Sequence, residues 1–406
     1  MKEITRLAAE EFVLETGKRV RLERWQVSKE DERVNDSVPA PSYVQARSAM
    51  DVFHGERLIG PRRPDEPGVD PRVRCLLPFA VDSSFARDFA AYRQIKSEHA
   101  TLEEEEARRP DLARRISRYA RLRLNLLNPK LDELATRLCG FEREGDSFKA
   151  KIAPSNWSFG RTSMDAGNIP LVHSPGDDTE LRELVRDLIR HFGYGMTLRE
   201  AYSKEWGKAG KLPSFDSGAC AWQLGTCSVS WVKRSGQFSI TRRGRGVGGL
   251  NTGRVCAASG GVHWSPFQET REKTPERNRG HEFTYVLDWE IGREFTEEVG
   301  CVHHAEPDPF SLHRLGFARE VPRMGSPEFF YRFDFEGDPD GLAEIIAQNT
   351  HPESEEIDCI VYALAPEDAI ALLTSPDGAD IIHYKGLMNL YWAITAMNIP
   401  EFRPIF

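Results

Sequence analysis

The sequence predicts an α+β protein in two parts, an N-terminal α+β region at residues 1–205 and a second domain at residues 206–406. Three observations support this prediction. The second part contains short segments of alternating apolar and polar residues, which are typical of strands. It also contains a helix pattern whose apolar residues recur every four positions. The first part ends in another helix pattern that has both a cap and a terminating glycine.

In the N-terminal region we expect short strands, then a long helical stretch, then a hairpin and a helix. The helix begins near Asp178, with Asp177 and Glu180 at capping-box spacing, and it ends at Gly193. The other segments are strand pieces at 12–14 and 19–22, helical sequence at 82–139, and a hairpin whose arms are 141–143 and 147–152.

In the second part, a strand at 227–232 and another at 238–241 flank Gly236, which supplies the turn. The segment 327–335 alternates apolar and polar residues, so we expect a half-buried strand there. Another strand is expected at 357–364. A helix at 386–397 completes the domain.

The segment 291–300 carries the chemistry. Ile291, Phe295 and Val299 recur every four residues and predict a helix with one apolar stripe, which Gly300 ends. Its other conspicuous residues are acidic, namely Glu294, Glu297 and Glu298. Like charges at this spacing repel by roughly 0.2–0.5 kcal/mol per pair. The acidic side of this helix therefore either faces open water or binds a cation, for which Mg²⁺ is the natural candidate.

This segment resembles the second half of the Nudix hydrolase signature, G-x5-E-x7-R-E-U-x-E-E-x-G-U, where U is a bulky apolar residue. The matching positions are Arg293, Glu294, Phe295, Glu297, Glu298 and Gly300, whereas Cys301 replaces an aliphatic residue. The resemblance implies an α/β/α sandwich around a mixed sheet. It also implies that Glu294, Glu297 and Glu298 ligate Mg²⁺ or Mn²⁺, with Arg293 orienting them and Glu294 and Glu298 serving catalysis.

The first half of the signature matches less regularly. Gly260 and Gly261 resemble the glycine turn, but Gly261 precedes Arg293 by 32 residues where the signature has 14. This spacing implies an insertion of 18 residues. Tyr285 stands where the early Glu of the signature would be, so we expect either Glu269 or Glu282 to replace that Glu.

The resemblance also implies where a substrate would bind. The glycine turn (Gly260, Gly261) and the basic strand end at Arg242 and Arg243 would contact phosphates, since guanidinium groups bind phosphate oxygens in a fork. A basic strand edge that prevents aggregation is the alternative for these arginines. Trp264 or Phe267 would stack on a base. Glu356, with Glu355 as the second choice, would add a catalytic carboxylate.

Composition limits the partners. The net charge of −9 predicts no broad nucleic-acid surface, and no apolar run reaches the ~20 residues that span a bilayer. The first residues lack the regions of a signal peptide. Seven scattered cysteines without C-x-x-C spacing indicate a reducing cytoplasm. The oligomeric state is left open, a homo-oligomer included.

The function implied by the resemblance is hydrolysis of the pyrophosphate of a nucleoside diphosphate linked to another moiety. The displaced early Glu keeps a second hypothesis open. In that hypothesis the chain is a Nudix-fold sensor or interaction module that binds a nucleotide and cleaves it weakly or not at all.

Overall fold

The structure is a computed structural model of the 406-residue chain. It describes residues 4–27, 79–80, 92–97, 107–124, 134–144, 147–167, 169–173, 177–207, 212–243, 255–256, 258–264, 282–300, 310–320, 323–348, 357–375 and 377–397.

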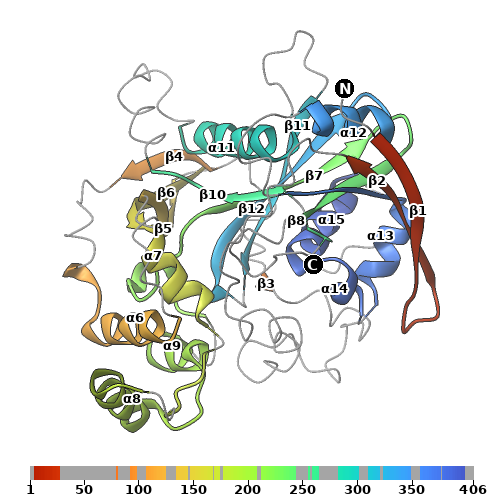
Figure 1. Ribbon diagram of the computed structural model, residues 1–406. Coiled ribbons are helices and arrows are strands. Elements are labelled where there is room, and N and C mark those ends of the chain that lie inside the picture. The colour runs from red at the N-terminus through yellow and green to blue at the C-terminus, as the bar shows by residue number, and fades with distance from the viewer. Residues whose placement is uncertain are drawn as a thin grey trace, which may run out of the picture.

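A mixed sheet forms the centre of the molecule (Figure 1). The strands β7 and β12 pair in parallel, and their neighbours pair antiparallel. Its main path, in spatial order, is β1 (Ile4–Val13), β2 (Arg19–Val27), β13 (Ile357–Leu364), β8 (Gln237–Arg243), β7 (Gly225–Val232), β12 (Ser326–Phe335), β11 (Phe310–Glu320) and β3 (Phe79–Ala80). Off this path, β10 (Ala258–Gly261) pairs with β7, and β9 (Val255–Cys256) pairs with β8.

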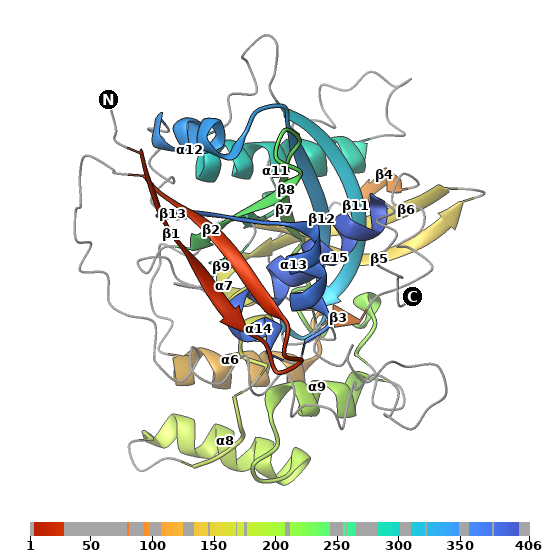
Figure 2. The same ribbon diagram turned by 90° about the vertical axis from the view of Figure 1, so that its right-hand side faces the viewer.

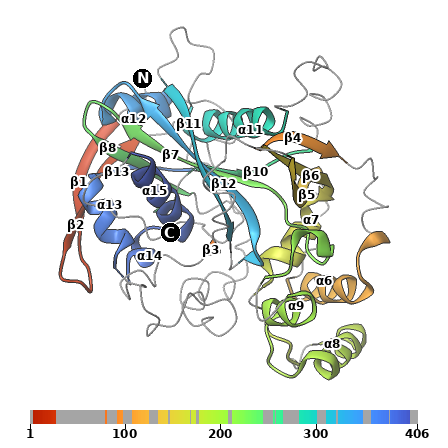
Figure 3. The same ribbon diagram turned by 180° about the vertical axis from the view of Figure 1, so that it is seen from behind.

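Helices cover both faces of this sheet, which makes three layers (Figures 1 and 3). On one face lie α11 (Glu282–Val299) and α12 (Pro339–Gln348), whose apolar side chains share one core with those of β12. On the other face lie α13 (Pro366–Leu373), α14 (Gly378–Ile381) and α15 (Tyr384–Ala396). The predicted α+β class with a mixed sheet is therefore confirmed.

A smaller sheet and a helical group lie beside the central sheet. The small sheet has the order β4 (Tyr92–Ser97), β6 (Ser147–Asn156) and β5 (Leu134–Glu144). The helical elements are α6 (Asp111–Leu124), α7 (Trp157–Gly160), the π-helix η4 (Arg161–Asp165), α8 (Thr179–Phe192), α9 (Leu198–Trp206) and the 3-10 turn η5 (Phe215–Ser217). Their apolar residues form a core of their own.

The N-terminal hairpin joins the central sheet. In Figure 2, β1 and β2 lie at the edge nearest the viewer, and β2 pairs antiparallel with β13. Residues from both sides of the predicted boundary at 205 thus share one sheet. Further along the chain, Leu138 N donates to Trp222 O over 3.0 Å and Thr136 N to Val262 O over 2.8 Å.

Several sequence predictions are confirmed. Gly236 has φ +65° between β7 and β8, and the strands predicted at 227–232, 238–241 and 357–364 are present. The hairpin arms at 141–143 and 147–152 lie in β5 and β6. The helix predicted at 386–397 is α15, which begins at Tyr384.

Three details differ from the sequence predictions. Every residue of β12 is buried, because the strand lies between β7 and β11 and has helices over both faces. The stretch 82–139 contains strand β4 and the start of β5 as well as helix α6. The cap of α8 is Asp178, whose side chain accepts from Leu181 N. Asp177 instead pairs with Arg123 over 2.5 Å.

A buried ionic cluster connects the sheet to α15. Lys385 Nζ lies 2.9 Å from Glu328 Oε1 and 3.7 Å from Glu320 Oε2, and both carboxylate residues are fully buried. Tyr384 donates its hydroxyl to Glu320. Burial acts to lower the pKa of Lys385, but the charges of Glu320 and Glu328 outweigh it and raise that pKa.

The same cluster reaches the helical group through Arg323, which lies 2.5 Å from Asp165 of η4 and 3.3 Å from Glu320. Charge pairing at these distances in a buried setting makes each member strongly dependent on its partners. Among the described residues, no helix is long and apolar enough to span a membrane.

Candidate functional site

The acidic helix α11 forms because its apolar residues repeat at helical spacing. Phe283, Leu287, Ile291, Phe295 and Val299 are each buried, and the ring of Phe295 stacks on Phe333 of β12 with centroids 3.9 Å apart. The helix continues through Gly292. It ends where Gly300, with φ +92°, takes the left-handed conformation predicted for it.

A carboxylate stripe runs beside this apolar stripe. Glu290, Glu294 and Glu298 follow one another at four-residue spacing and are 0%, 8% and 2% exposed. Glu297 is partly buried. The alternative of an acidic face in open water is therefore wrong, because burying several carboxylates together requires cationic or hydrogen-bonding partners.

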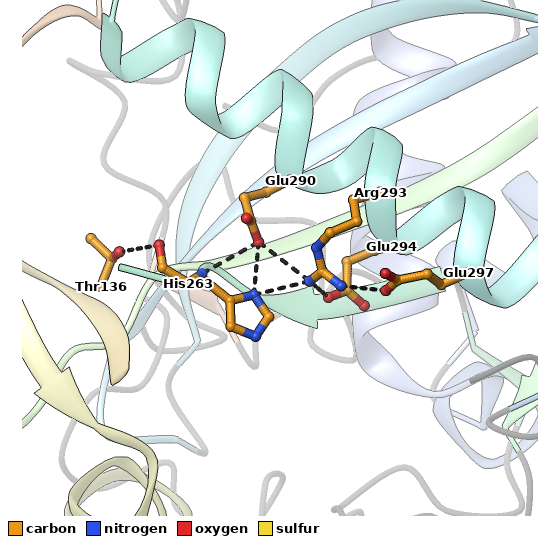
Figure 4. A network of polar contacts seen from close by, with 6 residues as sticks. All are labelled: Thr136, His263, Glu290, Arg293, Glu294 and Glu297. Carbon is orange, nitrogen blue, oxygen red and sulfur yellow. Dashed lines mark hydrogen bonds and ion pairs between the residues drawn. The ribbon is translucent and has the colours of Figure 1, made fainter. Parts of the chain in front are cut away.

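Arg293 supplies one such partner. Its Nη2 contacts a carboxylate oxygen of Glu294 and lies 3.4 Å from Glu290 Oε2, and its Nη1 donates to Glu297 (Figure 4). Burial acts to lower the pKa of Arg293, but the charges of Glu294 and Glu290 raise it above its ordinary value. Arg293 thus pairs with three carboxylates of the helix, those of Glu290, Glu294 and Glu297.

His263 approaches the same carboxylates from the sheet, immediately after β10. Its backbone N donates to Glu290 Oε2 over 3.3 Å, and its Nδ1 lies 3.1 Å from that oxygen (Figure 4). Its carbonyl accepts a hydrogen bond from Thr136 Oγ1 of β5 over 2.7 Å. The hydrogen bond with Glu290 raises the pKa of the imidazole, and burial opposes that shift.

Glycine is required where the helix meets β10. Gly260 pairs with Thr226 of β7, and a Cβ at Gly260 would lie 1.9 Å from the carboxyl carbon of Glu294. At the next position, a Cβ on Gly261 would lie 2.7 Å from the ring of Trp157. The predicted glycine turn is wrong in that both residues belong to strand β10, where the missing side chain of Gly260 allows a carboxylate to lie directly against the strand.

Gly260→Ala is expected to displace the Glu294 carboxylate and to weaken Mn²⁺ binding by about tenfold or more, with the fold retained and the free energy of unfolding lowered by about 1–3 kcal/mol. Isothermal titration with Mn²⁺ and urea unfolding measure the two effects. Gly341→Ala in α12 is the matched control, since its Cβ would meet atoms no nearer than 3.4 Å. Unchanged Mn²⁺ affinity in Gly260→Ala would contradict a metal role for Glu294.

The site can offer a cation three ligand atoms. One atom each from His263, Glu290 and Glu294 lies within 4.8 Å of the others. This group shares only Glu294 with the predicted ligands Glu294, Glu297 and Glu298. Glu297 is instead bound by Arg293, and Glu298 lies buried one turn beyond Glu294.

The other predicted site residues lie elsewhere or outside the described residues. Arg242 is half-buried on β8, opposite Val255 of β9, and Arg243 is the last residue of β8. Trp264 is half-buried, and its backbone N donates to Leu134 O over 3.1 Å. Of the candidates for the early Glu, Glu282 is the first residue of α11. Glu269, Glu355, Glu356 and Phe267 lie outside the described residues.

Sequence reasoning missed Glu290 and His263. Glu290 precedes Glu294 by four residues, so helical spacing alone places it on the same stripe. The signature has no Glu at that position, so the resemblance does not point to Glu290. His263 follows Gly261 by two residues, but only the folded strand brings it to the helix.

Comparison with known proteins adds no assignment. No protein-family model matches this chain, and no curated protein matches it either.

Proposed function

We propose that this chain is a divalent-metal-dependent hydrolase of the Nudix type. Its reaction would be cleavage of the pyrophosphate in a nucleoside diphosphate linked to another moiety. The observation that carries the proposal is the burial of Glu290 and Glu294 together beside Arg293, with Gly260 leaving space for a carboxylate against the strand. Mg²⁺ or Mn²⁺ is the proposed cofactor.

The donor set fits such an ion. Carboxylate oxygens are the ligands of Mg²⁺ and Mn²⁺, and a carboxylate oxygen of Glu290, Oε1, is buried with no hydrogen-bond partner among the described residues. A bound divalent ion would lower the pKa of a water ligand and neutralise charge on the pyrophosphate oxygens.

The chain's own residues would then serve the hydrolysis. The oxygen of water bonds to one phosphorus while the bridging phosphorus–oxygen bond breaks, and a carboxylate of the site receives a proton from that water. Glu298, Glu294 and Glu356 are the proposed acceptors. Before an ion binds, Arg293 would keep Glu294 oriented, while Arg242, Arg243 and Trp264 are proposed to hold the phosphates and the base.

Incubation of the full chain with nucleoside diphosphates linked to sugars, nucleosides or alkyl groups tests the proposal. We expect product with Mg²⁺ or Mn²⁺ and none after chelation, measured by phosphorus NMR. A ligand that raises the unfolding temperature without being cleaved would support the nucleotide-sensor alternative. Neither cleavage nor stabilisation across the panel would overturn both functions.

The proposed compartment is the cytoplasm. The free thiol of the buried Cys220 supports it, since free cysteines are typical of reducing compartments.

A further inference from the structure

The strongest unassigned feature is the position of one guanidinium nitrogen among the three ligand atoms of the site. Arg293 Nη2 lies 3.0 Å from His263 Nδ1 and 3.4 Å from Glu290 Oε2, and it also contacts Glu294 Oε1 (Figure 4). These three residues are the same ones that can offer ligand atoms to a metal. A positively charged group of the protein therefore lies in the middle of this donor set.

An independent observation shows that one carboxylate oxygen in this donor set is available to bind a cation. Glu290 is fully buried, and its Oε1 has no hydrogen-bond partner among the described residues. Its Oε2, in contrast, is approached by the backbone N of His263, by Nδ1 of His263 and by Arg293. A buried carboxylate oxygen without a partner is destabilising, so this oxygen is suited to a cation.

A metal and Arg293 cannot use this position together. Metal–ligand bonds to imidazole and carboxylate are about 2.0–2.2 Å long, so an ion bound to these three residues would overlap the position of Nη2. The two cations would also repel each other. His263 Nδ1 can accept a hydrogen bond from Arg293 only with the lone pair that a metal would use, and it can donate to Glu290 only when that position carries a proton, so either contact excludes the metal.

The donors also select the kind of ion. An imidazole nitrogen together with carboxylates suits Mn²⁺, Fe²⁺, Co²⁺ or Zn²⁺, whereas Mg²⁺ prefers a shell of oxygen ligands and water. His263 thus changes the preference expected for a site made of carboxylates alone.

The side chain of Arg293 has space to move toward solvent when an ion binds. Its Nη1 is held by Glu297, and the side chains of Arg293 and Glu297 are 20% and 14% exposed. The guanidinium can therefore turn outward without losing this partner or entering the apolar core.

We infer that His263, Glu290 and Glu294 form a centre for a first-row transition-metal ion, and that Arg293 is an internal cation which competes with the ion for these ligands. The inference deepens the proposed function, since it concerns the ion at the same site. It does not depend on which substrate is cleaved.

Metal binding to the full chain without substrate tests the inference, by isothermal titration with Mn²⁺, Zn²⁺ and Mg²⁺. We expect Arg293→Ala to bind Mn²⁺ about tenfold more tightly than the unmodified protein, and His263→Ala and Glu290→Gln to bind it about tenfold or more weakly. We also expect Mn²⁺ and Zn²⁺ to bind more tightly than Mg²⁺, and this difference to shrink in His263→Ala. Weaker Mn²⁺ binding in Arg293→Ala would overturn the competition, because it would mean that Arg293 only positions the carboxylates.

Arg314→Ala is the matched control. Arg314 pairs with Asp288 on the same helix, outside the ligand set, so its removal is expected to leave the affinity for Mn²⁺ unchanged. Circular dichroism establishes that each variant is folded.

If the His263→Ala variant does not fold, a measurement on the unmodified protein still tests whether His263 is a ligand. Electron spin echo modulation of bound Mn²⁺ is expected to show a coupled imidazole nitrogen, and its absence would overturn the assignment of His263. Tight Mn²⁺ binding without hydrolysis would sink the proposed function alone. Hydrolysis with Mg²⁺ that is insensitive to His263→Ala would sink this inference alone.

Discussion

Glu294→Gln is expected to lower metal-dependent hydrolysis by about a hundredfold or more, with the fold retained. The amide has the size of the carboxylate but no charge, so it cannot serve as an anionic ligand. The position is buried against Gly260 and beside Arg293, where no water-exposed acid can take its place. Steady-state turnover with saturating Mn²⁺ measures the loss.

The companion variant Glu298→Gln decides how far the ligand set extends. The resemblance to the Nudix signature implies a metal-binding and catalytic role for Glu298, and under the proposed function we expect divalent-dependent turnover to be abolished while the fold is kept. Glu183→Gln, an exposed position on α8, is the control and should leave turnover unchanged. Full turnover in Glu294→Gln would refute the site, whereas full turnover in Glu298→Gln alone would restrict it to the group around His263.

Lys385→Met is expected to lower the free energy of unfolding by about 3–5 kcal/mol, which is the usual effect of removing one partner of a buried ion pair. Methionine fills a similar volume but leaves the carboxylates of Glu328 and Glu320 without the ammonium group. Both are fully buried, so water cannot replace it. Urea unfolding at neutral pH measures the loss.

Two further variants control this experiment. Adding Glu328→Gln to Lys385→Met removes one stranded charge and should recover much of the lost stability. Lys233→Met breaks an exposed pair with Glu336 and should have no measurable effect. An unchanged free energy of unfolding in Lys385→Met would contradict the stabilising role of the buried ionic cluster.

The elements that could be predicted from the sequence are those whose signal is local. The repeat of Ile291, Phe295 and Val299 located α11, and Gly236 and Gly300 marked a turn and a helix end correctly. The burial of β12 on both faces was not predictable in this way. The strand alternates because Phe329, Tyr331 and Phe333 share a core with α11. Phe330 lies in the core that contains α15, and Glu328 pairs with Lys385 of that helix.

The candidate site likewise contains residues that local sequence predicts and residues that only the tertiary structure brings together. Arg293 and Glu294 were found because the signature is contiguous in sequence. Glu290 was available from helical spacing but lies outside the signature. His263 is 27 residues from Glu290 along the chain, and it meets the helix only because β10 pairs with β7 beneath it. Such a contact depends on tertiary structure that no local pattern encodes.

The pairing of β2 with β13 has a consequence for biosynthesis. The hairpin of β1 and β2 is synthesised before the strand it pairs with, which lies at residues 357–364. The edge of β2 that pairs with β13 therefore stays without this partner while the intervening residues are made. A nascent chain stalled before residue 357 would lack the pairing that joins this hairpin to the central sheet.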